Sequence, residues 1–123
     1  MRTPPVVLSI AGYDPSSGAG ITADIKTAAA LGCYAVTCVT AYTVQSTQGV
    51  FRVRALEPEL VSATLKALAD DVEIAAVRIG MLGSGEVASA VAEFVEERRL
   101  PNLVLDPVIR SSFGALLLDD AGL

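Results

Sequence analysis

Two aspartates occupy positions at which a carboxylate needs a partner or a ligand. Asp24 lies within the apolar sector of a predicted helix, a sector formed by Ile21, Ile25, Ala28 and Leu31. A carboxylate on that side must be paired or must line a cavity, because stranding it against the core is costly. Asp106 directly follows an apolar strand, and a carboxylate at a strand end commonly holds Mg²⁺ near phosphates. Both residues are therefore candidates for a ligand site.

Each of the two aspartates also has a simpler interpretation. Asp24 could stand at the edge of the apolar sector, where its side chain reaches water or bonds a nearby loop amide. Asp106 could cap its own loop before Pro107, since Asp and Asn commonly bond local backbone groups. The residue pattern alone leaves both interpretations open.

Predicted strands and helices alternate along the chain. Apolar, β-branched or alternating runs predict strands over 6–11, 35–41, 50–56, 75–81 and 103–106. Helical patterns cover 20–31, 58–71 and 85–99, with Ser84 as an expected N-cap, and the polar residues 42–49 are expected to form a loop. This alternation predicts a single α/β domain over 1–123, with a mainly parallel sheet and helices on both faces. The run 103–106 is as apolar as a central strand, yet little chain follows it, so we expect this chain to be the first part of a larger domain.

The ends of the predicted strands bring further candidates to one edge of the sheet. Gly12 follows the first strand, Met81 ends the fourth, and Gln45 lies beyond the second. A ligand at that edge could meet Asp24, Gln45, Met81 and Asp106 together. Met81 could instead be core filler and Gln45 a solvated loop residue. The segment 18–20, Gly-Ala-Gly, could present amides to an anion or could simply form a tight turn, and it matches no nucleotide-binding motif.

Composition excludes several classes of function. The chain of 123 residues has a net charge of −5 and no cluster of basic residues, which argues against a nucleic-acid surface. It contains no histidine, so the usual Ser-His and Cys-His catalytic pairs are absent, and Cys33 and Cys38 lack metal-ligand spacing. No apolar run approaches the ~20 residues of a membrane span. We expect a cytoplasmic protein.

Four segments together resemble a known family. They are SIAGYDPSSGAGITADIKTAAALG, VTAYTVQSTQGV, VRIGML and LVLDPV, which occur in this order along the chain. The set closely resembles the hydroxymethylpyrimidine/phosphomethylpyrimidine kinases of thiamine biosynthesis, which belong to the ribokinase-like superfamily. The resemblance implies a ribokinase-like α/β fold. It also implies transfer of the γ-phosphoryl group of ATP, with Mg²⁺, to the hydroxymethyl group and then to the monophosphate.

The same resemblance assigns roles to individual residues. The ring of 4-amino-5-hydroxymethyl-2-methylpyrimidine would contact Gly12, Asp24, Gln45, Met81 and Val108. Asp24 and Gln45 would read the ring nitrogens and the amino group, while Met81 and Val108 would pack on the ring. Asp106 would lie toward the phosphates and Mg²⁺. A homodimer is also implied.

The chain departs from the family in ways that affect what it can do. Tyr13 and Ser17 stand where many members carry Ser and Gly, and Phe113 replaces a small residue before Gly114. By this resemblance, family members continue past the position of Leu123 into a second half. That half holds the glycine-rich anion hole, the catalytic Cys or Asp and most of the ATP site. We therefore expect no catalytic residue here and an inactive chain on its own. The alternatives are a noncatalytic pyrimidine-binding module that ends at residue 123 and a pyridoxal kinase-like enzyme.

Overall fold

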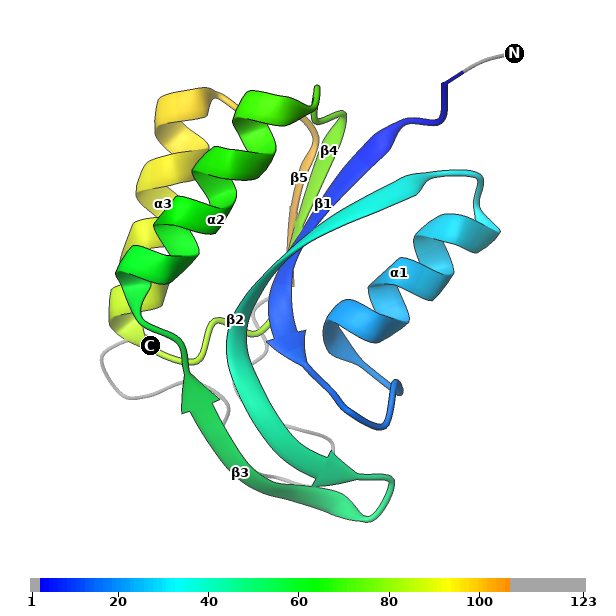
Figure 1. The fold of residues 1–123 in the computed structure, drawn as a ribbon, viewed down its shortest axis with the longest axis vertical. Helices are drawn as coiled ribbons and strands as arrows, with labels where there is room; N and C mark the ends of the chain where they lie inside the picture. The colour runs from blue at the N-terminus through cyan, green and yellow to red at the C-terminus, as the bar shows by residue number, and fades with distance from the viewer. Residues whose placement is uncertain (1–2, 107–123) are drawn as a thin grey trace.

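The computed structural model describes residues 3–106, which form one sheet with three helices (Figure 1). The elements in chain order are β1 (Val6–Tyr13), α1 (Gly20–Ala30), β2 (Tyr34–Ser46), β3 (Gly49–Ala55), α2 (Pro58–Asp71), β4 (Ala76–Ile79), α3 (Gly85–Arg98) and β5 (Leu103–Leu105). The predicted alternation of strands and helices is confirmed. None of the helices in the described part of the chain is long and apolar enough to span a membrane.

The strand order is β3-β2-β1-β4-β5. β1 pairs in parallel with β2 and with β4, and β4 pairs in parallel with β5, while β2 and β3 are antiparallel. The carboxyl ends of β1, β2, β4 and β5 therefore lie at the same edge of the sheet, as the sequence predicts. In an open α/β sheet this is the edge at which ligands bind.

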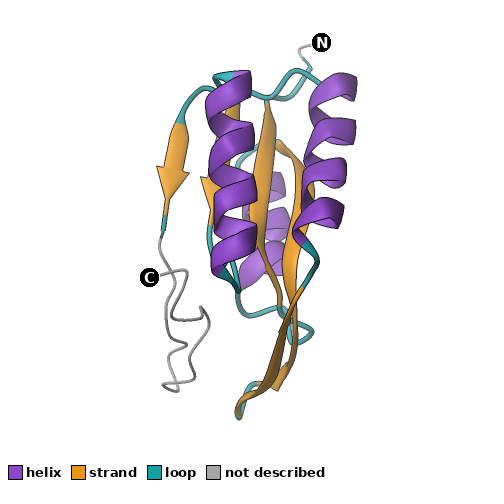
Figure 2. Cartoon of the chain, turned by 90° about the vertical axis from the view of Figure 1, so that its left-hand side faces the viewer, coloured by secondary structure: helices purple, strands orange, loops and turns teal. Residues whose placement is uncertain are grey.

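Helices cover both faces of the sheet. In Figure 2, α2 and α3 lie in front of the strands and α1 lies behind them. Leu8 and Ile10 of β1 are fully buried in a core with Val61 of α2 and Val91 of α3. Because successive side chains of a strand point to opposite faces, Ser9 between them points toward α1. The α1 face of β1 thus carries a buried polar side chain.

The second strand is longer than predicted. Residues 42–46, expected in a loop, continue β2 and pair with β3, so that Gln45 lies opposite Val50. The far part of this hairpin extends below the rest of the sheet in Figure 1. The prediction of a loop was wrong because the backbone of this polar segment finds its hydrogen-bond partners across the hairpin. Only the turn at 47–48 separates the two strands.

The fifth strand lies at the edge of the described sheet. Its three residues, predicted to resemble a central strand, are 47%, 61% and 58% exposed. Its only strand partner within residues 3–106 is β4. The apolar character of β5 is therefore not matched by burial in the described part of the chain.

The helices begin and end close to the predicted positions, but two inner faces are narrower than expected. Ser84 caps α3, since its Oγ accepts a hydrogen bond from the Val87 amide at 3.1 Å. In α1, Ile21 and Ala28 are buried, whereas Ile25 and the C-cap residue Leu31 are exposed. In α2, apolar spacing predicts an inner face with Leu60 beside Val61 and Leu65, but Leu60 is exposed. These side chains were misplaced because a helical sector predicted from spacing was wider than the surface that the sheet offers.

Candidate functional site

The loop after β1 is built around a buried carboxylate. Asp14 accepts hydrogen bonds from the Ser16 amide and hydroxyl at 2.8 and 2.6 Å, and from the Gly18 and Ala19 amides at 3.0 and 2.9 Å. Burial alone would raise the pKa of Asp14, but the hydrogen bonds from Ser16, Ala19 and Gly18 outweigh it and hold the pKa below its ordinary value. Asp14 lies among turn-forming residues in the sequence, and that pattern alone gives no sign of its role as a shared acceptor. Because Gly18 and Ala19 already donate to Asp14, their amides are not available to an external anion.

The first helix begins directly against the end of β1. Gly20 has a φ of +61°, and a Cβ at this position would overlap the carbonyl oxygen of Gly12. Only glycine combines this backbone conformation with so close an approach. Of the two interpretations of the Gly-Ala-Gly segment, the tight turn that packs the helix on the sheet is therefore the one that the geometry supports.

Two of the predicted site residues lie in contact, Gly12 and Met81. A Cβ on Gly12 would lie 2.7 Å from the Met81 sulfur, so the absence of a side chain there makes room for the methionine. Met81 is 8% exposed and packs with Ala41, and its carbonyl accepts a hydrogen bond from Thr40 Oγ1 at 2.5 Å. The chain therefore holds Met81 firmly beside the end of β1.

Gln45 lies near the same strand end. Its Oε1 is 3.0 Å from Thr43 Oγ1, and that hydroxyl is 2.7 Å from the carbonyl oxygen of Tyr13. Tyr13 follows Gly12, and its ring lies 5.5 Å from the ring of Tyr42. Gln45 is thus tied through Thr43 to the residue next to Gly12, and it belongs to a strand rather than to a solvated loop.

Asp24 points to the sheet and is paired there. Its Oδ2 accepts hydrogen bonds from Ser9 Oγ at 2.6 Å and from Arg78 Nη1 at 2.8 Å. The side chain of Asp24 is 18% exposed and that of Arg78 is 33% exposed. The second arm of the guanidinium, Nη2, lies 3.5 Å from Asp106 Oδ2. The two candidate carboxylates are therefore joined through Arg78.

A cavity of about 240 Å³ lies beside this network, between α1 and the sheet. Its lining combines the polar groups of Ser9, Asp24 and Arg78 with mainly apolar side chains, and the remaining lining residues are Val7, Thr27, Ala28, Leu31, Cys33 and Ala35. The position of Asp24 is thus explained by both a partner and a cavity. Neither Gln45 nor Met81 lines this cavity.

The predicted residues form two neighbouring groups rather than one cluster in contact. Gly12, Met81 and Gln45 gather at the ends of β1 and β2, and Asp24 and Asp106 are linked by Arg78 on the α1 face of the sheet. Val108 lies outside the described residues. Arg78 was not predicted. The signal was available, because an arginine inside the apolar strand 76–79 needs a partner for the same reason that Asp24 does.

Asp106 offers a carboxylate that suits a hard cation. Its side chain is 62% exposed, and Mg²⁺ in proteins is commonly held by one or two carboxylates, with water and phosphate oxygens completing its octahedron. Within residues 3–106, no group of three or more acidic or cysteine side chains could hold a metal by itself. Asp106 therefore fits a metal that arrives with phosphate groups, and it does not form a closed protein site.

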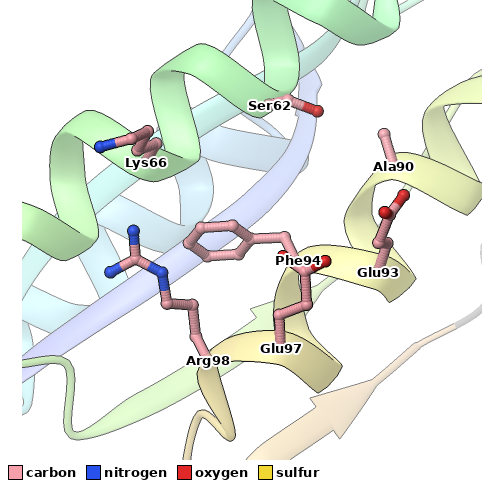
Figure 3. A pocket seen from close by; sticks show the side chains of 7 residues that line it. All are labelled: Ser62, Lys66, Ala90, Glu93, Phe94, Glu97 and Arg98. Carbon is pink, nitrogen blue, oxygen red and sulfur yellow. The ribbon is translucent and has the colours of Figure 1, made fainter.

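A second cavity, of about 350 Å³, lies between α2 and α3 on the opposite face of the sheet (Figure 3). Its charged side chains include Lys66 and Arg98, which both pair with Asp70, at 2.6 and 2.9 Å. The Arg98 guanidinium lies 5.5 Å from the centre of the Phe94 ring. None of the predicted site residues lines this cavity.

Comparisons with known proteins decide the family. The family model described as phosphomethylpyrimidine kinase matches residues 14–123. The chain belongs to the phosphomethylpyrimidine kinase family. A hydroxymethylpyrimidine/phosphomethylpyrimidine kinase of Aquifex aeolicus is 44% identical over 117 residues, which cover 95% of this chain and 46% of that protein. The chain thus spans about half the length of the curated relatives it matches.

Solved structures agree with this family of kinases. The phosphomethylpyrimidine kinase of Clostridium difficile superposes with a TM-score of 0.88 at 39% identity, over 96% of this chain and 51% of that one. The pyridoxal kinase of Bacillus subtilis, solved as an ADP complex, superposes with a TM-score of 0.77 at 29% identity, over 85% of this chain and 41% of that one. The predicted ribokinase-like α/β fold is confirmed.

The two thiols of this family member should differ sharply in reactivity. Cys38 is buried against α2, and burial raises the pKa of its thiol to about 12, whereas Cys33 is half-buried at the cavity beside Asp24. Because the thiolate is the reactive form, we expect one thiol per folded chain to react with Ellman's reagent at pH 8 and both to react after denaturation. Rapid reaction of both thiols in the folded protein would contradict this assignment.

Proposed function

We propose that the protein to which this chain belongs is an ATP-dependent kinase of 4-amino-5-hydroxymethyl-2-methylpyrimidine and its monophosphate in thiamine biosynthesis. In this proposal, residues 1–123 are the N-terminal portion of one ribokinase-like α/β domain, and this portion binds the pyrimidine substrate. The observation that carries the proposal is the inward carboxylate of Asp24, paired with Ser9 and Arg78 on the α1 face of the sheet, in a chain of this family. The catalytic residues are expected in the half that the relatives have in addition.

The two groups of residues offer the chemical groups that an aminopyrimidine ring would need as partners. Met81 provides an apolar surface at the end of β1, and Gly12 leaves room beside it. Gln45 offers an amide that can both donate and accept, and Asp24 offers a carboxylate that accepts. We propose that these four residues and Val108 bind the aminopyrimidine, and that their task is to orient the hydroxymethyl group for phosphoryl transfer.

The phosphates are assigned to the end of β5. Asp106 would hold Mg²⁺ there, and the ion would neutralise charge on the transferred phosphoryl group. Arg78, 3.5 Å from Asp106, adds a fixed positive charge on the same side. ATP is the proposed phosphoryl donor, supported by the kinase names of the relatives.

We further propose a cytoplasmic homodimer; the two free cysteines are compatible with a reducing compartment.

A pyridoxal kinase is the second candidate, because a structural neighbour at 29% identity carries that name. The higher identity to hydroxymethylpyrimidine/phosphomethylpyrimidine kinases, 44%, favours the pyrimidine. A noncatalytic pyrimidine-binding module is the third. It makes the same ring contacts without phosphoryl transfer, so binding and turnover must be measured separately.

Calorimetric titration with the hydroxymethylpyrimidine, with pyridoxal as competitor, tests the substrate. We expect the pyrimidine to bind and an equal concentration of pyridoxal to leave its affinity unchanged. Preferential binding of pyridoxal would replace the proposal by the second candidate.

A chain of residues 1–123 alone should show no ATP-dependent turnover, and turnover by it would contradict the assignment of catalysis to the other half.

A further inference from the structure

Both hydrogen bonds that Asp24 accepts end on the same oxygen. Ser9 and Arg78 each donate to Oδ2, over 2.6 and 2.8 Å. Within residues 3–106, no donor is bonded to Oδ1. A carboxylate has two oxygens that each accept, so Oδ1 keeps its full capacity to accept a hydrogen bond from a ligand.

The elements around Arg78 fix its position. β4, which carries it, is paired on both sides, with β1 and with β5. Gly80 lies two residues further along the same strand face and leaves room for the guanidinium, since a Cβ there would lie 2.9 Å from Nη1. The planar guanidinium also reaches Asp106, so its two arms span from helix α1 to the end of β5.

We propose that Arg78 is a positioning residue that acts with Ser9 to orient Asp24, so that the free Oδ1 accepts a hydrogen bond from the amino group of the bound pyrimidine. This inference rests on the proposed function, in which Asp24 reads the ring. Two donors on one oxygen, one of them charged, leave the carboxylate little freedom to turn. A fixed acceptor favours a ring that presents an N–H over a ring that presents only acceptors, because the latter leaves Oδ1 without a donor while Oδ2 keeps its bonds to Ser9 and Arg78.

The test compares two probes in the full-length gene product. One probe is the hydroxymethylpyrimidine, and the other is 5-hydroxymethyl-2-methylpyrimidine, which lacks the amino group. For Arg78→Met we expect the affinity for the aminopyrimidine to fall about tenfold, and that for the second probe to stay within about twofold. Arg78→Lys should recover part of the loss. Arg98→Met is the matched control, because Arg98 forms a similar ion pair with Asp70 on the opposite face and should change neither affinity.

The outcomes separate this inference from the proposed function. Equal weakening of both probes by Arg78→Met would show a merely structural role and overturn the inference. Equal affinity of the unaltered protein for the two probes would also overturn it, while the kinase proposal would stand. Failure of the unaltered protein to bind either probe would remove the proposed function and this inference with it. Should Arg78→Met not fold, as thermal unfolding would reveal, Ser9→Ala removes the other donor and carries the same expectation.

Discussion

Asp24→Ala is expected to weaken binding of 4-amino-5-hydroxymethyl-2-methylpyrimidine by about 100-fold or more, while the chain remains folded. The substitution removes the acceptor proposed for the ring. It also leaves the Arg78 guanidinium with only Asp106 as an acidic partner in the described part of the chain, and Ser9 without its acceptor. Isothermal titration calorimetry measures the affinity, and circular dichroism with thermal unfolding checks the fold.

Asp70→Ala is the matched control for this experiment. Asp70 also pairs with two basic side chains, Lys66 and Arg98, but it lies with α2 and α3 on the other face of the sheet. We expect Asp70→Ala to leave the affinity for the pyrimidine unchanged. A folded Asp24→Ala protein with unaltered affinity would show that Asp24 serves only to pair Arg78.

The parts of the fold that depend on local spacing were predictable from the sequence. Apolar spacing predicts α2 and α3, and the hydroxyl of Ser84 predicts where α3 begins. The observed ends of both helices lie close to the predicted ones. The inward position of Asp24 also follows from local spacing, because residues three and four apart share one face of a helix. What spacing could not supply was the partner of Asp24.

The remaining features depend on residues far apart in the sequence. Arg78 is 54 residues from Asp24, and only the parallel pairing of β1 with β4 brings them together. Likewise, the polar residues 42–46 become a strand because β3 returns beside them, which no pattern within the segment indicates. The sequence was therefore sufficient to name the candidate residues, whose roles stay predictions, but it could not show that they divide into two groups.

The acceptor role of Asp14 predicts the largest stability effect. Asp14→Ala removes the shared acceptor of the Ser16, Gly18 and Ala19 donors at a position that is 4% exposed. We expect the free energy of unfolding to fall by roughly 2–4 kcal/mol, because donors left without an acceptor in a buried loop are costly. Denaturant unfolding at pH 7 measures the change. Asp71→Ala, an exposed position at the end of α2, is the control and should have little effect.

The same carboxylate predicts how the effect depends on pH. Its folded-state pKa lies below the ordinary value of 3.8, so its ionised form stabilises the folded state above that pH, and the stabilisation is lost as pH falls through the lower, folded-state pKa. Asp14→Asn keeps the shape of the side chain but cannot ionise. The difference in unfolding free energy between the unaltered protein and Asp14→Asn should therefore be constant from pH 7 to about pH 5 and should shrink below pH 4. A difference that stays constant down to pH 2 would mean that the ionisation of Asp14 does not stabilise the folded state.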